Sequence, residues 1–451
     1  MVLITGLMFI SQAVASEDNR NVMKIYDGVI FYDGYMMDNN PDKGLDDGVT
    51  RHSCSLYSKK LTDSQLDALG EKLDIQVTVE ACCDNYDRIG NINIALVEKG
   101  QESYIPEETQ RIEIGRFITP FMDKNKEPKQ VPYSYETNYL SSILRDKALR
   151  DKYDLWLEFE LFGVPYAANQ QIAGCAGRSD VFAGTLELST TEPAGPTEGN
   201  ILVPIVIKKP EYIGTNLNNY REEATDELGK TVKTYSFDVP EDVVESQIVL
   251  ITSNHGANAN GEEYNRRWHF VYFDDELVLT YRPGRDSCEP FRQYNTQANG
   301  IYGNSKKSDA LWQSFSNWCP GDVIDNRIIE LEDVAKGEHK IRIEVPDAEF
   351  VDNQGDIPVS IYFHGSTTAT PDAVLPVMAD KELPVKFSNE KGIVTVTAAD
   401  EIEMIEVFSM AGERIEKVYD SSIVDLRGYR GVVIICTELS DGRVFSAKLQ
   451  L

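Results

Sequence analysis

The stretch that decides the fold reads IQVTVEACCDNYDRIGNINIAL and runs from Ile75 to Leu96. Apolar residues recur at every second position in residues 75–79, before its centre, and in residues 92–96, after it. This period of two is typical of β-strands, in which successive side chains point to opposite faces. The central run Cys83–Arg88 therefore lies on or between two strands, and it carries two acids, an aromatic ring and a guanidinium.

The same alternation recurs along the whole chain. Strand-like runs occupy residues 29–32, 155–161, 186–188 and 203–207, then 232–237, 248–252, 268–273, 277–281, 328–331, 340–345 and 359–363, and finally 393–396, 405–408, 432–436 and 445–449. Residues 189–200 and 365–375 are rich in turn-forming residues and indicate linkers. The pattern predicts an all-β protein with antiparallel sandwiches at residues 20–195 and 200–366 and a small β-sandwich at 380–451. Few contacts are expected to cross the second linker.

Two short helices are expected in the first half of the chain. Thr62 and Gln65 form a capping-box pattern that opens a helix ending at Leu69. Thr137 is expected to cap a second helix, with an apolar face in residues 140–148.

The composition excludes several classes of function. The 451 residues include 74 Asp and Glu against 44 Lys and Arg, so the net charge is -30. A field of this sign repels phosphate backbones and anionic lipids, which excludes nucleic-acid binding and a membrane-surface role. With 41% hydrophobic residues the chain still buries cores, and its length predicts two or three domains.

The N-terminal residues indicate export. Residues 2–15 are uncharged and mostly apolar, and they end in Ala13-Val14-Ala15 ahead of Ser16. An apolar run followed by small residues predicts a signal peptide at residues 1–16, although no basic residue precedes the run. We therefore expect a protein of the periplasm, the cell surface or the medium. No later run reaches the about 20 apolar residues of a membrane-spanning helix, so no membrane span is expected.

Carboxylate chemistry is the main catalytic option that the motifs leave. None of the five histidines is spaced for zinc, and the chain has no Walker loop, no Gly-x-Ser-x-Gly turn and no Cys-x-x-Cys pair. Three acidic places stand out: Asp87 in the central run, Glu158 with Glu160 on one strand face, and Glu263 after a Gly- and Asn-rich loop. The first two have an ordinary alternative, because an acid beside Arg88 often forms a surface ion pair and the two strand glutamates fit a solvent-facing side.

Three runs together resemble a known family. Cys83–Arg88, Gly115–Phe121 and Trp318–Gly321 are similar to motifs of bacterial peptide-N-glycosidase F, in the same order and within residues 23–365. The resemblance implies two adjacent jelly-roll domains and an amidase that hydrolyses the bond between asparagine and the innermost GlcNAc of N-glycans. Such an enzyme releases the glycan and leaves aspartate. The resemblance further implies no cofactor, N-glycoproteins and glycopeptides as substrates, and a monomer.

The resemblance also assigns site residues. Asp87, Glu263 and Glu160 fall on the family's catalytic carboxylates, with Glu158 as the alternative to Glu160. The residues expected to bind substrate are Arg88, Tyr86, Phe162, His255 and Trp318, with Tyr86 in place of a tryptophan. Asp84, beside them, is a further candidate for orienting a sugar. The set suits amide hydrolysis, because carboxylates that are crowded together separate their pKa values into a base and an acid.

The seven cysteines fit an exported protein with disulfides. Cys288 and Cys319 flank a loop rich in Asn, Gly and Ser, and the resemblance supports a bond between them. One of the adjacent residues 82 and 83 is expected to form a second bond. The pairings that stay open involve Cys54, Cys82, Cys83 and Cys175.

The C-terminal unit and the activity both leave alternatives. Val407–Glu413, Val424–Arg427 and Gly442–Lys448 resemble the C-terminal sorting domain of type IX secretion cargo, which would make the secretion machinery a partner. An accessory sandwich that stabilises the enzyme is the alternative. Two rival functions are an endo-acting glycoside hydrolase on N-glycans, which also needs two carboxylates, and a non-catalytic glycan-binding protein.

Overall fold

The computed structural model describes residues 20–35, 45–207, 216–219, 228–256, 262–297, 308, 310, 312, 316–350, 355–367, 385–398, 400–409, 413–440 and 443–451. The all-β class is confirmed, because antiparallel sheets dominate the described chain and the helices are short. The predicted signal peptide at residues 1–16 and most of the second linker lie outside the described residues.

The first sandwich packs two antiparallel sheets against each other. One sheet has the order β1 (Asn21–Tyr32), β9 (Asp180–Thr190), β4 (Leu73–Ala81) and β7 (Gln130–Glu136). The other has the order β16 (Val323–Ile324), β6 (Gln110–Ile118), β5 (Ile89–Glu98), β8 (Tyr153–Leu161), β3 (Leu56–Lys60) and β2 (Val49–Arg51). Strand β16 comes from the second half of the chain, so this sheet is completed from beyond the first predicted linker.

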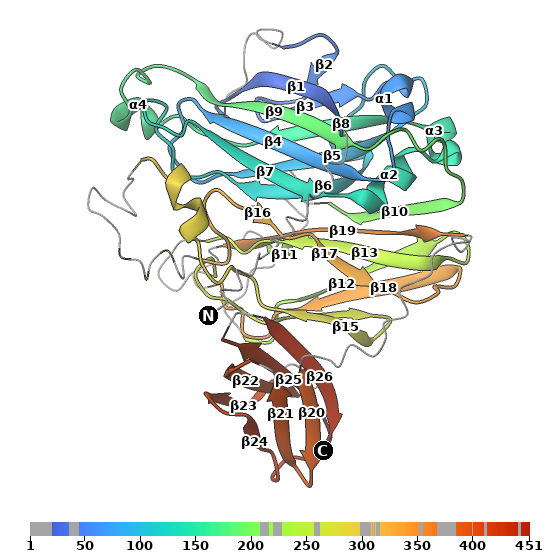
Figure 1. The fold of residues 1–451 in the computed structure, drawn as a ribbon, viewed down its shortest axis with the longest axis vertical. Helices are drawn as coiled ribbons and strands as arrows, with labels where there is room; N and C mark the ends of the chain where they lie inside the picture. The colour runs from blue at the N-terminus through green and yellow to red at the C-terminus, as the bar shows by residue number, and fades with distance from the viewer. Residues whose placement is uncertain are drawn as a thin grey trace, which may run out of the picture.

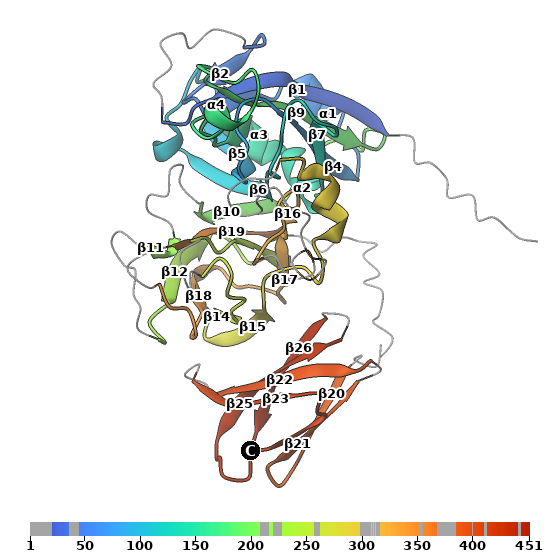
Figure 2. The same cartoon turned by 90° about the vertical axis from the view of Figure 1, so that its left-hand side faces the viewer.

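The second and third sandwiches follow in chain order. In the second, β10 (Asn200–Val206), β19 (Asp356–Ser366), β13 (Val244–Thr252) and β17 (Arg327–Glu330) face β12 (Val232–Val239), β18 (Gly337–Glu344), β14 (His269–Phe273) and β15 (Glu276–Tyr281), and β11 (Asn216–Asn219) also pairs with β19. In the third, β20 (Val385–Glu390), β21 (Ile393–Ala398) and β24 (Ile423–Asp425) face β23 (Arg414–Tyr419), β22 (Ile402–Ser409), β25 (Val432–Leu439) and β26 (Val444–Gln450). The three sandwiches stack one upon another, with the third farthest from the first (Figures 1 and 2).

Short helices lie at the ends of the first sandwich. They are α1 (Asp63–Asp67), α2 (Asn138–Leu144), α3 (Lys147–Lys152) and α4 (Ala168–Gln171), with 3-10 turns at Pro106–Glu108 and Glu289–Tyr294. The capping box of Thr62 and Gln65 at α1 is confirmed. The predicted side-chain cap of α2 is wrong, because the Thr137 hydroxyl donates to the Leu73 carbonyl oxygen instead of accepting from the helix.

Burial along the strands shows which faces are covered. Strand β4 alternates as predicted, with the side chains of Leu73, Ile75, Val77 and Val79 in the core. Strands β5 and β8 are instead buried on both faces almost throughout. One face of each carries apolar residues into the core, so polar residues of the opposite face, such as Asn91 and Glu160, are buried as well. A buried polar face of this kind requires internal hydrogen-bond partners.

The expectation that few contacts join the third sandwich to the rest is wrong. An apolar cluster spans the boundary and contains Trp268, Phe270 and Tyr272 of the second sandwich with Met404, Phe408, Ile434 and Cys436 of the third. The Trp268 indole N–H also donates to the Glu406 carboxylate, and Arg282 pairs with Glu438. The third sandwich therefore covers large aromatic side chains of the second, which a chain ending before it would expose to water.

Two disulfides join four of the seven cysteines. Cys83 bonds to Cys175, which selects one of the pairings that the sequence left open. Cys288 bonds to Cys319 across 31 residues of sequence. Cys82 and Cys436 are thiols, and Cys436 is buried in the apolar cluster below the second sandwich.

Removing the Cys288–Cys319 bond is expected to lower stability without a direct effect on chemistry. Joint replacement of both cysteines by serine is expected to reduce the free energy of unfolding by roughly 3–4 kcal/mol, because a loop of this length then regains its freedom in the unfolded chain. Urea unfolding of the variant and the wild type measures the difference. Mass mapping that finds both thiols free in the oxidised wild type would contradict the expectation.

Candidate active site

The loop between β4 and β5 is held in place by the carboxylate of Asp84. This fully buried group accepts hydrogen bonds from the backbone N–H of Tyr86 (2.9 Å) and of Val164 (2.7 Å). It also accepts from Arg88 Nε at 2.7 Å. The sequence singled out Asp84 as a sugar-orienting residue, whereas the structure uses its oxygens to fix the loop and the Arg88 side chain.

The run Gly115–Phe121 supports the same loop from β6. The Arg88 N–H donates to Thr119 Oγ1 at 2.8 Å, and the Thr119 N–H donates to the Arg88 carbonyl oxygen at 2.8 Å. The Arg88 guanidinium lies over the Tyr86 ring, 5.3 Å from its centroid, and the Tyr86 ring meets Phe121 edge-on at 6.3 Å. Tyr86 thus lies at the side of an apolar cluster that also contains Trp318. The runs Cys83–Arg88 and Gly115–Phe121, which are separate in the sequence, together form one wall of the candidate site.

Glu263 reaches this wall from the segment between β13 and β14. Its buried carboxylate accepts from the Gly256 N–H at 3.2 Å and from the Tyr264 hydroxyl. Its backbone carbonyl oxygen accepts from the Asn317 N–H at 3.0 Å, one residue before Trp318. The glutamate is therefore fixed both by its own loop and by the segment that carries Trp318.

Asp87 and Glu263 lie close enough to act on each other electrostatically. Burial, together with the nearby negative charge of Glu263, raises the pKa of Asp87 to about 7, and Arg88 only partly opposes this. Burial also raises the pKa of Glu263, although the Gly256 N–H and the Tyr264 hydroxyl favour its ionised form. Two acids with raised pKa values can hold and exchange protons near neutral pH. The pair therefore suits general acid–base chemistry.

His255 belongs to a hydrogen-bonded chain that crosses the junction of the two sandwiches. Its Nε2 lies 2.8 Å from Ser253 Oγ, and its ring lies 5.9 Å from that of Trp318. Ser253 Oγ in turn accepts from Arg116 Nη1 at 2.8 Å. Arg116 is fully buried and makes a two-pronged ion pair with Glu113 on the same strand, with both distances 2.8 Å. The position of His255 thus depends on the first sandwich.

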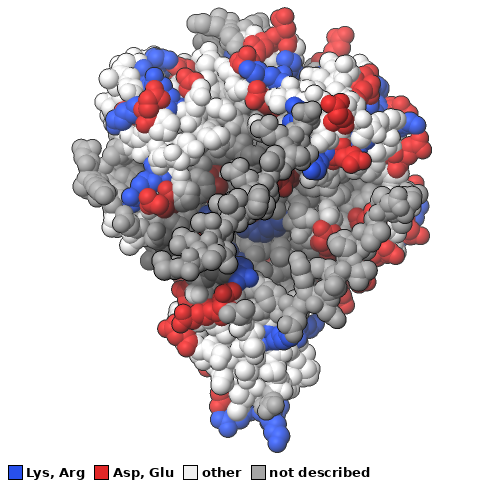
Figure 3. Space-filling view, viewed as in Figure 1, with Lys and Arg blue, Asp and Glu red and all other residues white. Residues whose placement is uncertain are grey.

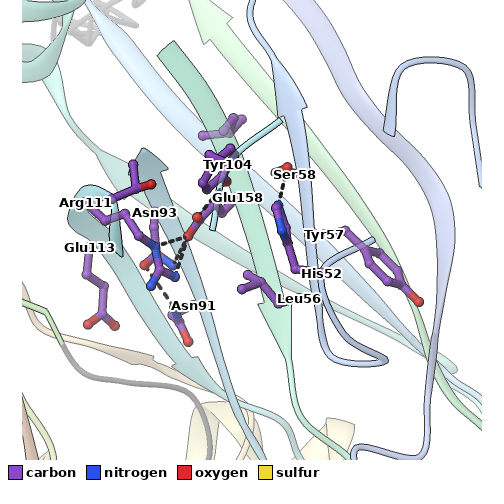
Figure 4. Close-up of polar contacts among 12 residues, drawn as sticks. His52, Leu56, Tyr57, Ser58, Asn91, Asn93, Tyr104, Arg111, Glu113 and Glu158 are labelled. Carbon is purple, nitrogen blue, oxygen red and sulfur yellow. Dashed lines mark hydrogen bonds and ion pairs between the residues drawn. The ribbon is translucent and has the colours of Figure 1, made fainter. Parts of the chain in front are cut away.

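The structure distinguishes Glu158 from Glu160. The carboxylate of Glu158 accepts from Arg111 at 2.6 Å, from Asn93 Nδ2 at 2.8 Å and from the Tyr104 hydroxyl at 2.7 Å, as the dashed lines in Figure 4 show. Asn91 extends this network by donating to Asn93 at 2.9 Å. The oxygens of Glu158 are thus engaged in holding the buried polar face together.

Glu160 lies on the same strand face, one step nearer to the loop of Asp87. It is opposite Asn91 in the pairing of β8 with β5, and Asn91 is opposite Arg116 in the pairing of β5 with β6. Glu160, Asn91 and Arg116 therefore form a row across the sheet, all of them buried. The alternative of a solvent-facing strand side is wrong for both glutamates, because Glu158 is 0% and Glu160 is 4% exposed.

Phe162 packs against residues of the first sandwich. Its ring fills the space above Gly34, where a Cβ would lie 2.4 Å from it. The ring also meets Tyr35 edge-on at 5.2 Å, and Tyr35 stacks against Tyr166 at 6.5 Å. Both tyrosines are largely exposed. Phe162 thus belongs to an aromatic group on the surface of the first sandwich.

Tyr264 also belongs to the candidate site, although it was not predicted from the sequence. Its hydroxyl donates to the Glu263 carboxylate, and burial together with the charges of Glu263 and Asp87 raises the pKa of the phenol. The signal was available, because an aromatic residue directly follows the assigned glutamate, but only the fold brings its hydroxyl to the pair. Among the residues that the structure describes, no group of three His, Cys, Asp or Glu side chains is placed to hold a metal ion.

Comparisons with known proteins bear on the family and the fold. Residues 22–176 match the family described as peptide-N-glycosidase F, N terminal, and residues 219–364 match peptide-N-glycosidase F, C terminal. The structure of PNGF-II aligns with a TM-score of 0.56 and 17% identity over 77% of this chain and 65% of that chain. PNGase F, a glycosylasparaginase from Flavobacterium meningosepticum, aligns with a TM-score of 0.49 and 16% identity over 78% of this chain and 97% of that chain. A search of curated proteins gave no match.

The matches cover the first two sandwiches and only part of the PNGF-II chain. The chain spans about two thirds of the length of PNGF-II, and the third sandwich lies beyond both matched ranges. The likeness to PNGF-II supports the fold of the first two sandwiches. The two family matches follow each other in the order of the domains and cover well over half of the 451 residues. The chain therefore belongs to the peptide-N-glycosidase F family.

Proposed function

We propose that the protein hydrolyses the amide bond between asparagine and the innermost GlcNAc of N-glycans, releasing the glycan and leaving aspartate in the peptide. The observation that carries this proposal is the meeting of Asp87 and Glu263, from different sandwiches, as two carboxyl groups with raised pKa values. Membership of the peptide-N-glycosidase F family supports the choice of bond.

The two acids divide the work of amide hydrolysis. An amide nitrogen is a poor leaving group, so its departure requires a proton, while the attacking water must lose one. Asp87 in its ionised form takes a proton from the water that attacks the asparagine carbonyl carbon. Glu263, whose pKa is raised by burial, gives a proton to the nitrogen as the carbon–nitrogen bond breaks. The peptide then carries a carboxylate, and the glycan leaves with the amine.

The remaining residues position the reacting groups. Arg88 lies beside Asp87 and favours its ionised form, which opposes the effect of burial. Tyr86 and Trp318 offer aromatic faces suited to the apolar faces of sugar rings, and His255 lies beside Trp318. Glu160 is proposed as the third carboxylate because the oxygens of its neighbour Glu158 are engaged with Arg111, Asn93 and Tyr104.

The product identifies the reaction. A denatured N-glycopeptide is incubated with the full chain, and the former attachment site is analysed by mass spectrometry. The proposal expects aspartate at that position and no remaining sugar. Asparagine that still bears one GlcNAc would show the rival glycoside hydrolase, and an intact glycopeptide bound to the protein would show the rival glycan-binding protein.

The rate is expected to rise with pH through the pKa of Asp87. Because the base must be ionised and Glu263 must keep its proton, kcat/KM should increase about tenfold per pH unit below pH about 7, and it should fall again only at the higher pH where Glu263 loses that proton. A pH profile of kcat/KM on a glycopeptide that contains no titrating group in this range measures this rise. A kcat/KM that falls as the pH rises through 7 would contradict the role of Asp87 as base and assign it as the acid.

The disulfides and the family fit an extracytoplasmic protein, because disulfides persist in oxidising compartments. We infer export to the periplasm, the cell surface or the medium, where N-glycoproteins of other organisms are met. No helix of the described chain has the length and apolar character needed to cross a membrane.

A further inference from the structure

Two tyrosines of the first sandwich present their rings to water side by side. Tyr35 is 66% and Tyr166 is 54% exposed. Their rings are nearly parallel, with an interplanar angle of 17° and centroids 6.5 Å apart, and Tyr35 meets Phe162 edge-on at 5.2 Å. Aromatic side chains that gather at a surface, rather than occurring singly, indicate a binding site. Tyr35, Tyr166 and Phe162 are called the aromatic platform below.

A buried carboxylate fixes both tyrosines. Asp33, only 1% exposed, accepts a hydrogen bond from the Tyr35 backbone N–H at 3.1 Å and from the Tyr166 hydroxyl. Gly34, between Asp33 and Tyr35, donates its N–H to the Gly163 carbonyl oxygen at 2.8 Å. A carboxylate is costly to bury unless it is hydrogen-bonded, and here it holds the two exposed tyrosines. Rings that are fixed before a ligand arrives lose little freedom when it binds.

The segment that carries Phe162 and Tyr166 is hydrogen-bonded to the loop between β4 and β5. The Phe162 N–H donates to the Ile89 carbonyl oxygen at 3.4 Å, and the Val164 N–H donates to the Asp84 carboxylate at 2.7 Å. The same carboxylate accepts from Arg88 Nε at 2.7 Å. The platform and the loop of the proposed base therefore share one buried anchor.

Two further links continue beyond Tyr166. Asn85 Nδ2 donates to Gln171 Oε1 at 2.8 Å, at the end of α4, and Cys175 bonds to Cys83. Tyr166 thus lies within a segment that is joined to residues 83–89 both before it and after it. The platform is continuous with the candidate active site through these contacts.

The platform suits a neutral ligand that is apolar on one face. The net charge of -30 and the carboxylate of Asp33 disfavour an anion. On the face of the molecule shown in Figure 3, acidic and basic residues are interspersed rather than gathered by sign. A tyrosine ring combines a flat apolar face with a polar tip. A sugar ring matches it, because the C–H groups of one sugar face pack on the aromatic ring while the hydroxyl groups stay in water.

We propose that Tyr35 and Tyr166 form a glycan subsite, on which a neutral sugar ring beyond the innermost GlcNAc stacks while the bond to asparagine lies at the carboxylate pair. The proposal rests on the proposed amidase function, since the N-glycan is the substrate of that reaction. Phe162, which was expected from the sequence to bind substrate, supports the Tyr35 ring through its edge-on contact. The subsite makes the length of the glycan, rather than the peptide, the property that is selected.

The test compares glycopeptides that share one peptide and carry neutral glycans of increasing length, from one sugar to a full branched N-glycan. The double variant Tyr35→Ala with Tyr166→Ala is expected to raise KM for the full glycan by about tenfold, because the stacking contacts are lost, and to act through KM rather than kcat. The effect is expected to shrink as the glycan is shortened. The length at which it disappears identifies the sugar that stacks.

Tyr419→Ala serves as the matched control, because Tyr419 is a tyrosine of the third sandwich that is 63% exposed and lies outside the platform. It should leave KM as in the wild type for every glycan. Tyr35→Phe keeps the ring face and should restore most of the affinity that Tyr35→Ala loses, and thermal unfolding shows that each variant is folded. A double variant whose KM rises equally for all glycans, or by less than about twofold for the full one, would overturn the subsite. So would a KM effect that follows the length of the peptide instead.

Direct binding separates failure of the subsite from failure of the proposed activity. A neutral N-glycan oligosaccharide without peptide is titrated by calorimetry into the full-length wild type and into the double variant. Binding to the wild type that is about tenfold weaker in the variant supports the subsite even if no glycopeptide is cleaved, a result that would overturn the amidase instead. Cleavage of glycopeptides with the same KM by both proteins, together with equal or absent binding of the oligosaccharide, overturns the subsite alone.

Discussion

Asp87→Asn is expected to lower kcat for glycopeptide hydrolysis by about 10²–10⁴-fold, the effect typical of removing a general acid–base group, or by more if the carboxylates act in concert. Asparagine keeps the shape of the side chain and cannot take a proton from water. Initial rates on a denatured glycopeptide measure the loss. A rate close to that of the wild type would overturn the assignment of Asp87.

Matched substitutions sharpen this test. Asp27→Asn changes an exposed aspartate on β1 and should leave the rate unchanged. Glu263→Gln should be about as severe as Asp87→Asn. Glu160→Gln is expected to reduce kcat with little change in stability, whereas Glu158→Gln should mainly lower stability, because Arg111 then loses its buried partner. The reverse result for the two glutamates would exchange their roles.

The same Asp87→Asn variant is expected to be more stable than the wild type at about pH 8. Folding raises the pKa of Asp87 from 3.8 to about 7. The folded chain therefore binds this proton more tightly than the unfolded chain, and the stabilisation present at low pH is lost as the pH rises through 7. Asparagine has no charge to bury, so its unfolding temperature should exceed that of the wild type above this pH. Such a trade of stability for activity is common at catalytic sites.

Arg116→Met is expected to lower the free energy of unfolding by about 3–5 kcal/mol, because it leaves Glu113 charged and buried without its partner. The loss also removes the hydrogen bonds from Arg116 to Ser253 Oγ at 2.8 Å and to the Pro358 carbonyl oxygen at 3.0 Å, both in the second sandwich. Urea unfolding monitored by tryptophan fluorescence measures the change. A loss below about 1 kcal/mol would contradict the structural role of this pair.

Two further variants isolate the buried charge as the cause. Arg178→Met breaks an exposed pair with Asp180 and should cost no more than about 1 kcal/mol. The double change Arg116→Met with Glu113→Leu removes both charges and is expected to recover much of the loss, since a buried ion pair can often be replaced by apolar residues. A double variant as unstable as Arg116→Met alone would show that the hydrogen bonds to the second sandwich dominate.

Local patterns predicted the parts of the fold that depend on near neighbours in the chain. The period-two alternation in residues 75–79 and 92–96 became β4 and β5, and the capping box at Thr62 formed as expected. Thr137 failed as a cap because a distant acceptor, the Leu73 carbonyl oxygen, took its hydroxyl. The prediction was wrong where a tertiary contact replaced a local one.

The sequence predicted which residues belong to the candidate site, and it did not predict how they are arranged. The resemblance named Asp87 and Glu263, but residues 176 positions apart cannot be placed together by periodicity. Glu158 and Glu160 were equivalent in sequence, because both lie on the same face of one strand. They differ once the neighbouring strands are in register, since Glu158 is then beside Asn93 and Glu160 beside Asn91. A shift by one residue would turn both side chains into the core.

The sequence by itself determined the all-β class, the strand positions and, through its resemblance to one family, the carboxylates worth testing. Only the tertiary structure decided that Cys83 bonds to Cys175, that Arg116 joins the first two sandwiches, and that the third sandwich covers Trp268. The physical reason is the range of each interaction. Side-chain alternation is a property of a few consecutive residues, whereas burial, ion pairing and the proton affinity of Asp87 depend on groups brought together by packing from distant parts of the chain.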